Sequence, residues 1–301
     1  MTITSNFIEK IKAILQDYPR NHSVNSLRNA FVLLEKARKL SGIDSNMAAF
    51  LSITAEEEAV ASIFLTLKQL RYDGADKISH RNHIHKAAFY PFCQALTHTF
   101  ELFEKNKPQL VIDQNSDNPR LYVRFFVEDF EGKSFVAQPD VPFGFTIRNE
   151  VCIEYFENNL KHYFGDHFEK LKNWLSNAAN KRNRILYASP NGIPKVQFND
   201  AEKYFDEYER KINTLMLLYF LIAPYREKQA FVQQALHGFV KMLGKVPDEE
   251  KLLEMIENME EAPVSYNFDL NTGKMKGFKI NSSAIEQIEF TEDKVNIKVA
   301  G

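Results

Sequence analysis

The stretch from Lys181 to Ser189 reads KRNRILYAS. It follows a long segment with helical periodicity and precedes the run PNGIP at 190–194, which is rich in helix breakers. The stretch therefore marks the end of a helix. At that end the sequence places Arg182, Asn183 and, five positions after the arginine, Tyr187.

The segment around this stretch is basic. From 161 to 195 the chain has seven lysines and arginines and two acids, a local net charge of +5 in a protein whose net charge is −2. A basic helix end of this kind suits phosphate contacts by Lys181, Asn183, Arg184 and Lys195 and base stacking on Tyr187. The alternative is a solvated basic face that is offset by the acidic stretch 248–261.

Composition places the chain among soluble globular proteins. It has 301 residues, of which 44% are apolar and 26% charged. Cys93 and Cys152 match no metal or redox spacing, so we expect free thiols in a reducing cytoplasm. The first residues lack a signal-peptide pattern, and the most apolar run, 215–223, is too short to span a membrane. We expect a cytoplasmic protein without membrane partners.

Apolar residues at helical spacing predict a mainly helical protein. Asp44 is a plausible N-cap for the longest of these helices. The predicted helices cover 7–18, 24–40, 44–72, 86–107, 153–180, 200–223 and 226–243, and a further helix begins near 247.

Two regions show strand patterns instead. Residues 121–127 are rich in β-branched and aromatic side chains, and apolar residues alternate with others from 141 to 147. Alternation returns at 264–270 and 295–299. We predict an α+β fold: two helical halves of a bundle at 1–107 and 150–245, a β insertion at 108–149, and a C-terminal helix and β meander at 246–301.

Two acidic residues lie close to the apolar face of the helix predicted at 44–72. Glu56 falls within the apolar stripe, Glu57 lies on its edge and Glu58 faces solvent. Since a buried carboxylate is costly unless it is paired, Glu56 and Glu57 should meet a cation or donor from another helix. The pair is either structural, or it orients a catalytic or RNA-binding arginine.

A histidine-rich run, HRNHIHK, spans 80–86 just before a helix. His83 and His85 alone are a weak zinc signal, and the spacing of helical carboxylate centres is absent. We expect no metal and no other cofactor; the alternative is a metal enzyme that uses Glu56, Glu57 and the histidines at 80–85. His83, His85 and Lys86 are predicted to start the helix or to pair with the glutamates. Glycine-rich phosphate loops and nucleophile elbows are also absent from the sequence.

Three short motifs occur in a characteristic order: Ala-Glu-Glu at 55–57, His-Ile-His-Lys at 83–86, and Arg-Asn-Arg-Ile-Leu-Tyr at 182–187 before a glycine and proline turn. This order resembles the abortive-infection AbiV branch of the HEPN superfamily over roughly 25–105 and 150–200. The superfamily signature is Arg-Asn-x-x-x-His, and here Tyr187 stands at the histidine position.

The resemblance implies a four-helix core that dimerises to form an RNA-binding cleft, and metal-independent RNA cleavage. In this resemblance, Arg182 steadies the scissile phosphate, Asn183 helps to position the substrate, and Tyr187 stands at the position of the catalytic histidine. Glu56 and Glu57 are the candidate catalytic carboxylates. Tyrosine, with an ordinary pKa of about 10, can donate a proton but is a poor base at neutral pH.

The expected function is therefore an RNA-binding protein or ribonuclease of a bacterial defence or toxin type that acts as a homodimer. The alternative is a non-catalytic interaction or regulatory module of a defence system.

Overall fold

The structure is a computed structural model. It describes residues 4–101, 108–113, 119–128, 134–137, 141–146, 152–165, 171–187, 192 and 194–245, and the strands 264–268, 275–280, 285–291 and 294–299. The predicted helix near 247 lies outside these residues.

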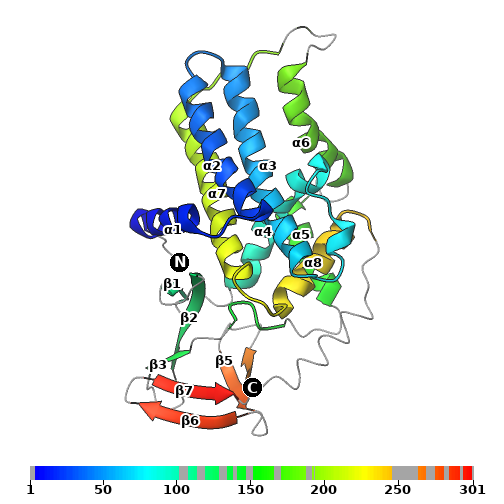
Figure 1. Ribbon diagram of the computed structural model, residues 1–301. Coiled ribbons are helices and arrows are strands. Elements are labelled where there is room, and N and C mark those ends of the chain that lie inside the picture. The colour runs from blue at the N-terminus through cyan, green and yellow to red at the C-terminus, as the bar shows by residue number, and fades with distance from the viewer. Residues whose placement is uncertain are drawn as a thin grey trace. The chain divides into compact units, whose positions relative to one another are not determined.

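Helices dominate the described part of the chain (Figure 1). The α-helices are α1 (Ser5–Asp17), α2 (His22–Leu40), α3 (Ser45–Gln69), α4 (His83–Glu101), α5 (Cys152–Phe164), α6 (Leu171–Leu186), α7 (Ala201–Ile222) and α8 (Ala230–Met242), and a 3₁₀ turn, η1, covers Ala75–Lys77. An α+β, mainly helical fold is confirmed.

The chain divides into two compact units that differ from the predicted domains. One unit contains 3–94 and 160–223, which we call the helical unit; the other contains 1–2, 95–159 and 224–301, which we call the mixed unit. The boundaries therefore fall inside α4 and α5. Each unit is described separately below.

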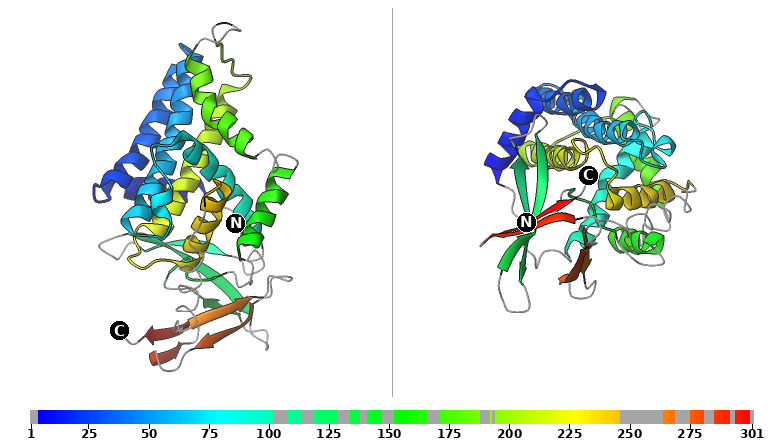
Figure 2. Two further views of the ribbon diagram at one scale, coloured as in Figure 1. Left: turned by 90° about the vertical axis from the view of Figure 1, so that its right-hand side faces the viewer. Right: turned by 60° about the horizontal axis from the view of Figure 1, so that its bottom comes forward.

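The helical unit is built around α3. Helices α2 and α7 pack along it and along each other, and α6 packs against α3 from another side (Figures 1 and 2). The shared core is apolar and aromatic, as the amphipathic patterns require. Its fully buried side chains include Leu27, Val60, Phe64, Ile212, Met216, Tyr219 and Phe220.

Several helix starts match the sequence signals. Asp44 caps α3, and its carboxylate accepts a hydrogen bond from the backbone N–H of Met47 at 2.9 Å. Asp200 caps α7 in the same way through the N–H of Lys203, at 2.9 Å. Each cap satisfies an N–H that the first turn of a helix leaves without a partner.

The single helix predicted at 153–180 is wrong. It is two helices, α5 and α6, and α5 ends just before Gly165. Gly165 has φ +51°, a left-handed conformation that glycine adopts without strain and that stops a helix. The periodicity missed the break because apolar residues keep their spacing on both sides of it. As a result, Arg182 lies in the last turns of a separate helix, α6.

The mixed unit contains three small antiparallel sheets. β1 (Gln109–Asp113) and β3 (Ser134–Ala137) both pair with β2 (Arg120–Glu128). β4 (Val264–Phe268) pairs with β5 (Met275–Ile280), and β6 (Ile285–Thr291) pairs with β7 (Lys294–Val299). The C-terminal meander is thus resolved into two separate strand pairs.

The strand predicted at 141–147 is wrong for its described residues, 141–146, which form a turn. The backbone of Phe143 bonds to the start of α8: its N–H donates to Gln229 Oε1 at 2.8 Å and its carbonyl accepts from Phe231. Pro142 also lacks the N–H that a sheet ladder needs. The rings of Phe143 and Phe145 instead pack against the ring of Phe231.

Among the described residues, no helix is long and apolar enough to cross a membrane.

Candidate functional site

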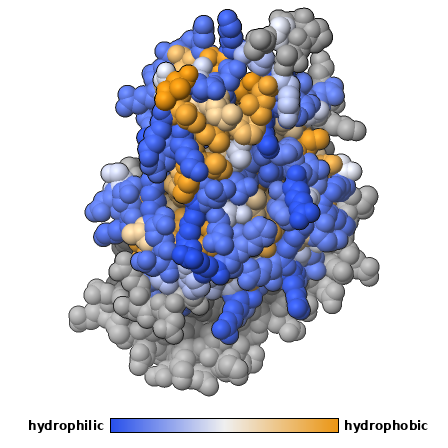
Figure 3. All heavy atoms as spheres, turned by 45° about the horizontal axis from the view of Figure 1, so that its top comes forward, coloured by the Kyte–Doolittle hydropathy of each residue, from blue (hydrophilic) through white to orange (hydrophobic). Residues whose placement is uncertain are grey.

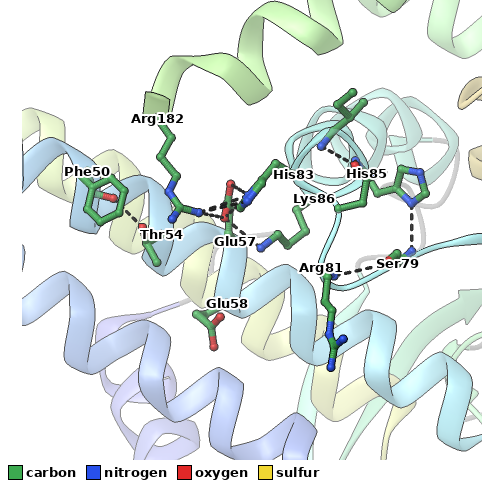
Figure 4. Close-up of polar contacts among 12 residues, drawn as sticks. Phe50, Thr54, Glu57, Glu58, Ser79, Arg81, His83, His85, Lys86 and Arg182 are labelled. Atoms are coloured by element: carbon green, nitrogen blue, oxygen red, sulfur yellow. Dashed lines mark hydrogen bonds and ion pairs between the residues drawn. The ribbon is translucent and has the colours of Figure 1, made fainter. Parts of the chain in front are cut away.

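One buried carboxylate in the helical unit gathers three basic side chains. Glu57, in the middle of α3, is 5% exposed. Its oxygens lie 2.9 Å from His83 Nδ1, 2.9 Å from Lys86 Nζ and 3.3 Å from an Nη1 of Arg182 (Figure 4). We call Glu57, His83, Lys86 and Arg182 the Glu57 centre. The prediction that Glu57 meets a cation from another helix is confirmed.

The start of α4 places two of these partners. Asn82 caps the helix, since its side-chain oxygen accepts hydrogen bonds from the N–H groups of Ile84, at 2.9 Å, and His85, at 3.3 Å. His83 and Lys86 then stand three residues apart, on one face of the helix. The cap therefore sets the first turn of α4 so that both side chains reach the same carboxylate.

The third partner comes from α6. The guanidinium of Arg182 lies between Glu57 and the ring of Phe50, 4.7 Å from the ring centroid (Figure 4). Phe50 and Glu57 are seven residues apart, two turns of α3, and so share a face. The sequence reading missed Phe50. Its spacing from Glu57 was the available signal, but the same spacing is typical of core residues.

The Glu57 centre is closed on one side and open on the other. The side chains of Glu57 and Lys86 are each 7% exposed, whereas those of Arg182 and His83 are 27% and 45% exposed. Lys86 and Arg182 bring two positive charges to one carboxylate, so the centre stays cationic even when His83 is neutral. An open cationic site with a buried counter-charge can receive an anion.

The hydrogen bonds also orient the imidazole of His83. Its Nδ1 donates to Glu57, which leaves Nε2 of a neutral ring as an acceptor. Nη1 of Arg182 is 3.4 Å from both ring nitrogens. A carboxylate that holds one ring nitrogen while the other faces a reacting group is the arrangement of carboxylate–histidine catalytic pairs. Histidine can exchange a proton near neutral pH.

Glu56 belongs to a different site. Its carboxylate pairs with Lys211 of α7 at 3.2 Å, and that ammonium also lies 4.7 Å from the ring centroid of Tyr208 and 5.5 Å from that of Tyr90. The prediction that Glu56 meets a cation is confirmed. The prediction that Glu56 lies deeper in the apolar stripe than Glu57 is wrong. Glu57 is the more deeply buried of the two, because α6 covers the side of α3 that carries it. No contact joins Glu56 to the Glu57 centre among the described residues.

His85, the other predicted accessory histidine, has a structural role through its Nδ1. That atom accepts the backbone N–H of Ser79 at 3.0 Å, which ties the turn before α4 to the helix (Figure 4). His85 is 7% exposed. Within the described ranges, no three histidine, cysteine or acidic side chains come together as a metal site would need.

The remaining predicted residues lie around the end of α6. Tyr187 is 67% exposed, and within the described residues its side chain has no contact with the Glu57 centre. Lys181, Asn183 and Lys195 are exposed, and Arg184 donates to the carbonyl of Asn177 at 2.7 Å. The structure therefore brings Arg182, Glu57, His83 and Lys86 together, while Tyr187 and Glu56 stand apart from them.

The segment after α6 is fixed at the beginning of α3. Asn46 donates to the carbonyl of Pro194 and accepts the N–H of Val196, each at 2.7 Å. Ser45 donates to the carbonyl of Val196 at 2.6 Å. These bonds hold Lys195 beside the first turn of α3. Phe50 and Glu57 lie further along the same helix.

The described residues thus define a helical protein with an open cationic centre over a buried carboxylate. Comparison with protein-family models, curated proteins and solved structures finds no match.

Proposed function

We propose that this protein is a HEPN-like RNA-binding protein of a bacterial defence or toxin type, and that the Glu57 centre cleaves RNA without a metal ion. The observation that carries the proposal is the meeting of Arg182 and His83, from two helices, over the buried carboxylate of Glu57. These are the two residue types that phosphodiester cleavage by internal attack requires: a fixed cation and a proton acceptor.

In the proposed reaction, Nε2 of His83 takes the proton of a ribose 2′-hydroxyl. The 2′-oxygen then attacks the adjacent phosphorus, the bond to the 5′-oxygen breaks, and the leaving oxygen takes a proton from solvent. Arg182 faces the charge that grows on the phosphate oxygens. Glu57 holds His83 through Nδ1 and favours the imidazolium that forms.

The surroundings of Arg182 support a polyanionic substrate. From 171 to 198 the chain has no acidic residue, and Lys181, Arg184 and Lys195 are exposed around the end of α6. Backbone phosphates are attracted to such a segment without regard to base sequence. Tyr187, which is largely exposed, is available to stack on an unpaired base.

A homodimer is part of this proposal. Exposed apolar side chains occur at the start of α3, where Ile43 is 83% and Met47 36% exposed. Figure 3 turns this end of the helical unit toward the viewer and shows apolar residues gathered among polar ones. Light scattering of wild type and of Ile43→Asp tests the point: the substitution should convert a dimer into a monomer, and a monomeric wild type contradicts it.

The test of the nuclease is cleavage of labelled RNA by purified protein in the presence of a chelator. Wild type should cut the RNA and leave 2′,3′-cyclic phosphate and 5′-hydroxyl ends. Arg182→Ala should abolish cutting, whereas Arg38→Ala, which removes an arginine paired with Asp206 and Glu209 on another face, should not. RNA that stays intact and unbound under all conditions contradicts the proposal.

The second candidate is a non-catalytic interaction module. It is favoured by the existing pairing of Arg182 with Glu57, since a structural ion pair needs no substrate. Under this alternative, Arg182→Ala lowers the melting temperature, and the wild type binds a protein partner but does not cut RNA.

A further inference from the structure

The run at 80–86 carries a second basic group besides the Glu57 centre. His83 and Lys86 reach Glu57, but the side chain of Arg81 points away from it (Figure 4). The ring of His80, the first residue of the run, lies edge-on to the ring of His22, with centroids 5.7 Å apart. His22 is the first residue of α2, so its ring lies at a helix N-terminus, where the helix dipole favours an anion.

The charges of this group have no acidic partners. Among the described residues, the side chains of His22, Lys68, His80 and Arg81 form no ion pair and no hydrogen bond. Nδ1 of His80 is shut off from solvent and has no partner. Elsewhere in the helical unit, basic side chains such as Lys12, Arg38 and Lys211 are matched to carboxylates.

Basic side chains near His80 disfavour a positive charge on its imidazole. Burial lowers the pKa of His80 below its ordinary 6.5, and the nearby charges of Lys68, His22, Arg81 and Lys86 lower it further. No acid is among these strongest influences on the imidazole. An anion bound here would relieve this repulsion.

We propose that His22, Lys68, His80 and Arg81 form a second phosphate-binding site, which holds a backbone phosphate of the same RNA next to the one at Arg182 and His83. We call it the His80 site. The RNA part of this inference rests on the proposed function. The chemistry that the site recognises is a phosphate group, whether it belongs to an RNA strand or to a free phosphate ion.

The 79–86 segment links the two sites rigidly. Ser79 accepts the N–H of Arg81 at 3.2 Å and donates its own backbone N–H to His85, and Asn82 caps α4. Lys86, which pairs with Glu57, is also close enough to act on the pKa of His80. One short, hydrogen-bonded segment therefore serves both sites, and a strand that follows it would contact them in turn.

Histidine NMR gives a direct test. The pKa of His80 is measured in the full-length protein alone, with inorganic phosphate, and with a 2′-O-methyl oligonucleotide that cannot be cleaved. A phosphate group at the site favours the imidazolium, so the oligonucleotide should raise the pKa of His80. If phosphate alone raises it and the oligonucleotide does not, the site takes free phosphate and the RNA assignment is overturned. If neither raises it, the whole inference is overturned.

The salt dependence of binding gives a second readout. The affinity for the oligonucleotide falls with salt, with a slope of roughly 0.7 for each phosphate contact to a single strand. Lys68→Ala and Arg81→Ala should each reduce that slope by about this amount. Arg38→Ala serves as the matched control and should leave the slope unchanged. Slopes equal to wild type in both site variants contradict the inference.

A variant of the Glu57 centre separates this inference from the nuclease proposal. In Arg182→Ala, inorganic phosphate should still raise the pKa of His80, because Arg182 is not part of the His80 site. If phosphate acts in this variant but RNA is never cut by wild type, the nuclease proposal fails and the phosphate site stands. If phosphate acts on wild type only, the separate site is contradicted.

Discussion

Glu56 and Glu57 are neighbours in α3, yet their carboxylates lie in different surroundings. Glu56 meets one cation, Lys211, whose ammonium lies close to the rings of two tyrosines. Glu57 meets three basic side chains from two helices, and two of these, His83 and Arg182, remain partly open to solvent. One step along a helix turns a side chain by about 100°, so adjacent residues face different neighbours.

This difference distinguishes Glu56 and Lys211, which form a structural ion pair, from the Glu57 centre, which is a candidate reactive site. In the structural pair, Lys211 faces two carboxylates, Glu56 and Glu207, and the rings of two tyrosines, so no excess positive charge remains. Burial opposes the charge of Lys211, but Glu56 and Glu207 outweigh that effect and raise its pKa above the ordinary 10.5. In the Glu57 centre the cations exceed the carboxylate, so the site can still attract an anion.

The largest expected effect is on stability. Glu57→Gln leaves Lys86, which is 6% exposed, without a counter-charge, and should lower the free energy of unfolding by about 3–5 kcal/mol. Glu56→Gln should cost about 1–2 kcal/mol, because Lys211 keeps Glu207 at 3.5 Å. Urea denaturation of both variants measures the difference. Equal losses would show that the two carboxylates are equivalent.

The next effect is on the reaction. His83→Asn keeps an amide that can donate to Glu57 but removes the proton acceptor, so RNA cleavage should fall by about 10²–10⁴-fold while RNA binding is retained. Single-turnover rates and fluorescence anisotropy measure the two quantities. His162→Asn, on α5, is the control with an exposed histidine. A cleavage rate equal to wild type would remove His83 from the mechanism.

A smaller effect is expected at alkaline pH. Because the pKa of Lys211 is raised in the folded protein, its contribution to stability is complete below about pH 10.5 and is lost as the pH rises through the raised value. The double variant Glu56→Gln with Lys211→Met should lose less stability above pH 10.5 than wild type. Thermal melts across pH 8 to 11.5 test this, and parallel curves would contradict it.

The smallest effect is expected at Tyr187. Since its side chain is 67% exposed and does not contact the Glu57 centre, Tyr187→Phe should leave the rate of RNA cleavage unchanged. Tyr187→Ala, which also removes the ring, should weaken binding by about 1–3 kcal/mol if the ring stacks on a base. A loss of cleavage in Tyr187→Phe would return this tyrosine to the catalytic role that the resemblance assigns to it.

Much of the helical architecture could be predicted from local signals. Asp44 caps a helix as predicted, and Asp200 caps the helix that was predicted to begin at 200, because capping depends on a few neighbouring atoms. The break at Gly165 and the turn at 141–146 could not be predicted from periodicity. Gly165 ends α5 by its own conformation, and the turn is held by Gln229, 86 residues after Phe143.

The candidate site could be predicted only in part. Sequence patterns selected Glu57, His83, Lys86 and Arg182, and predicted that the glutamates meet basic side chains from other helices. They could not show that Arg182 reaches a carboxylate 125 residues earlier, because that contact depends on how α6 packs on α3. For the same reason, the periodicity of α3 could not decide which of Glu56 and Glu57 would be the more deeply buried.

The most direct test of the central claim is a pair of matched charge removals. Glu57→Gln with Lys86→Met and Glu56→Gln with Lys211→Met each replace an ion pair by neutral side chains. Folded proteins often tolerate this change even where the pair is buried, as Glu57 and Lys86 are. The rate of RNA cleavage without metal is measured for both folded variants. We predict that the first loses cleavage and that the second cleaves at the wild-type rate. Cleavage by the first variant at the wild-type rate would contradict the account.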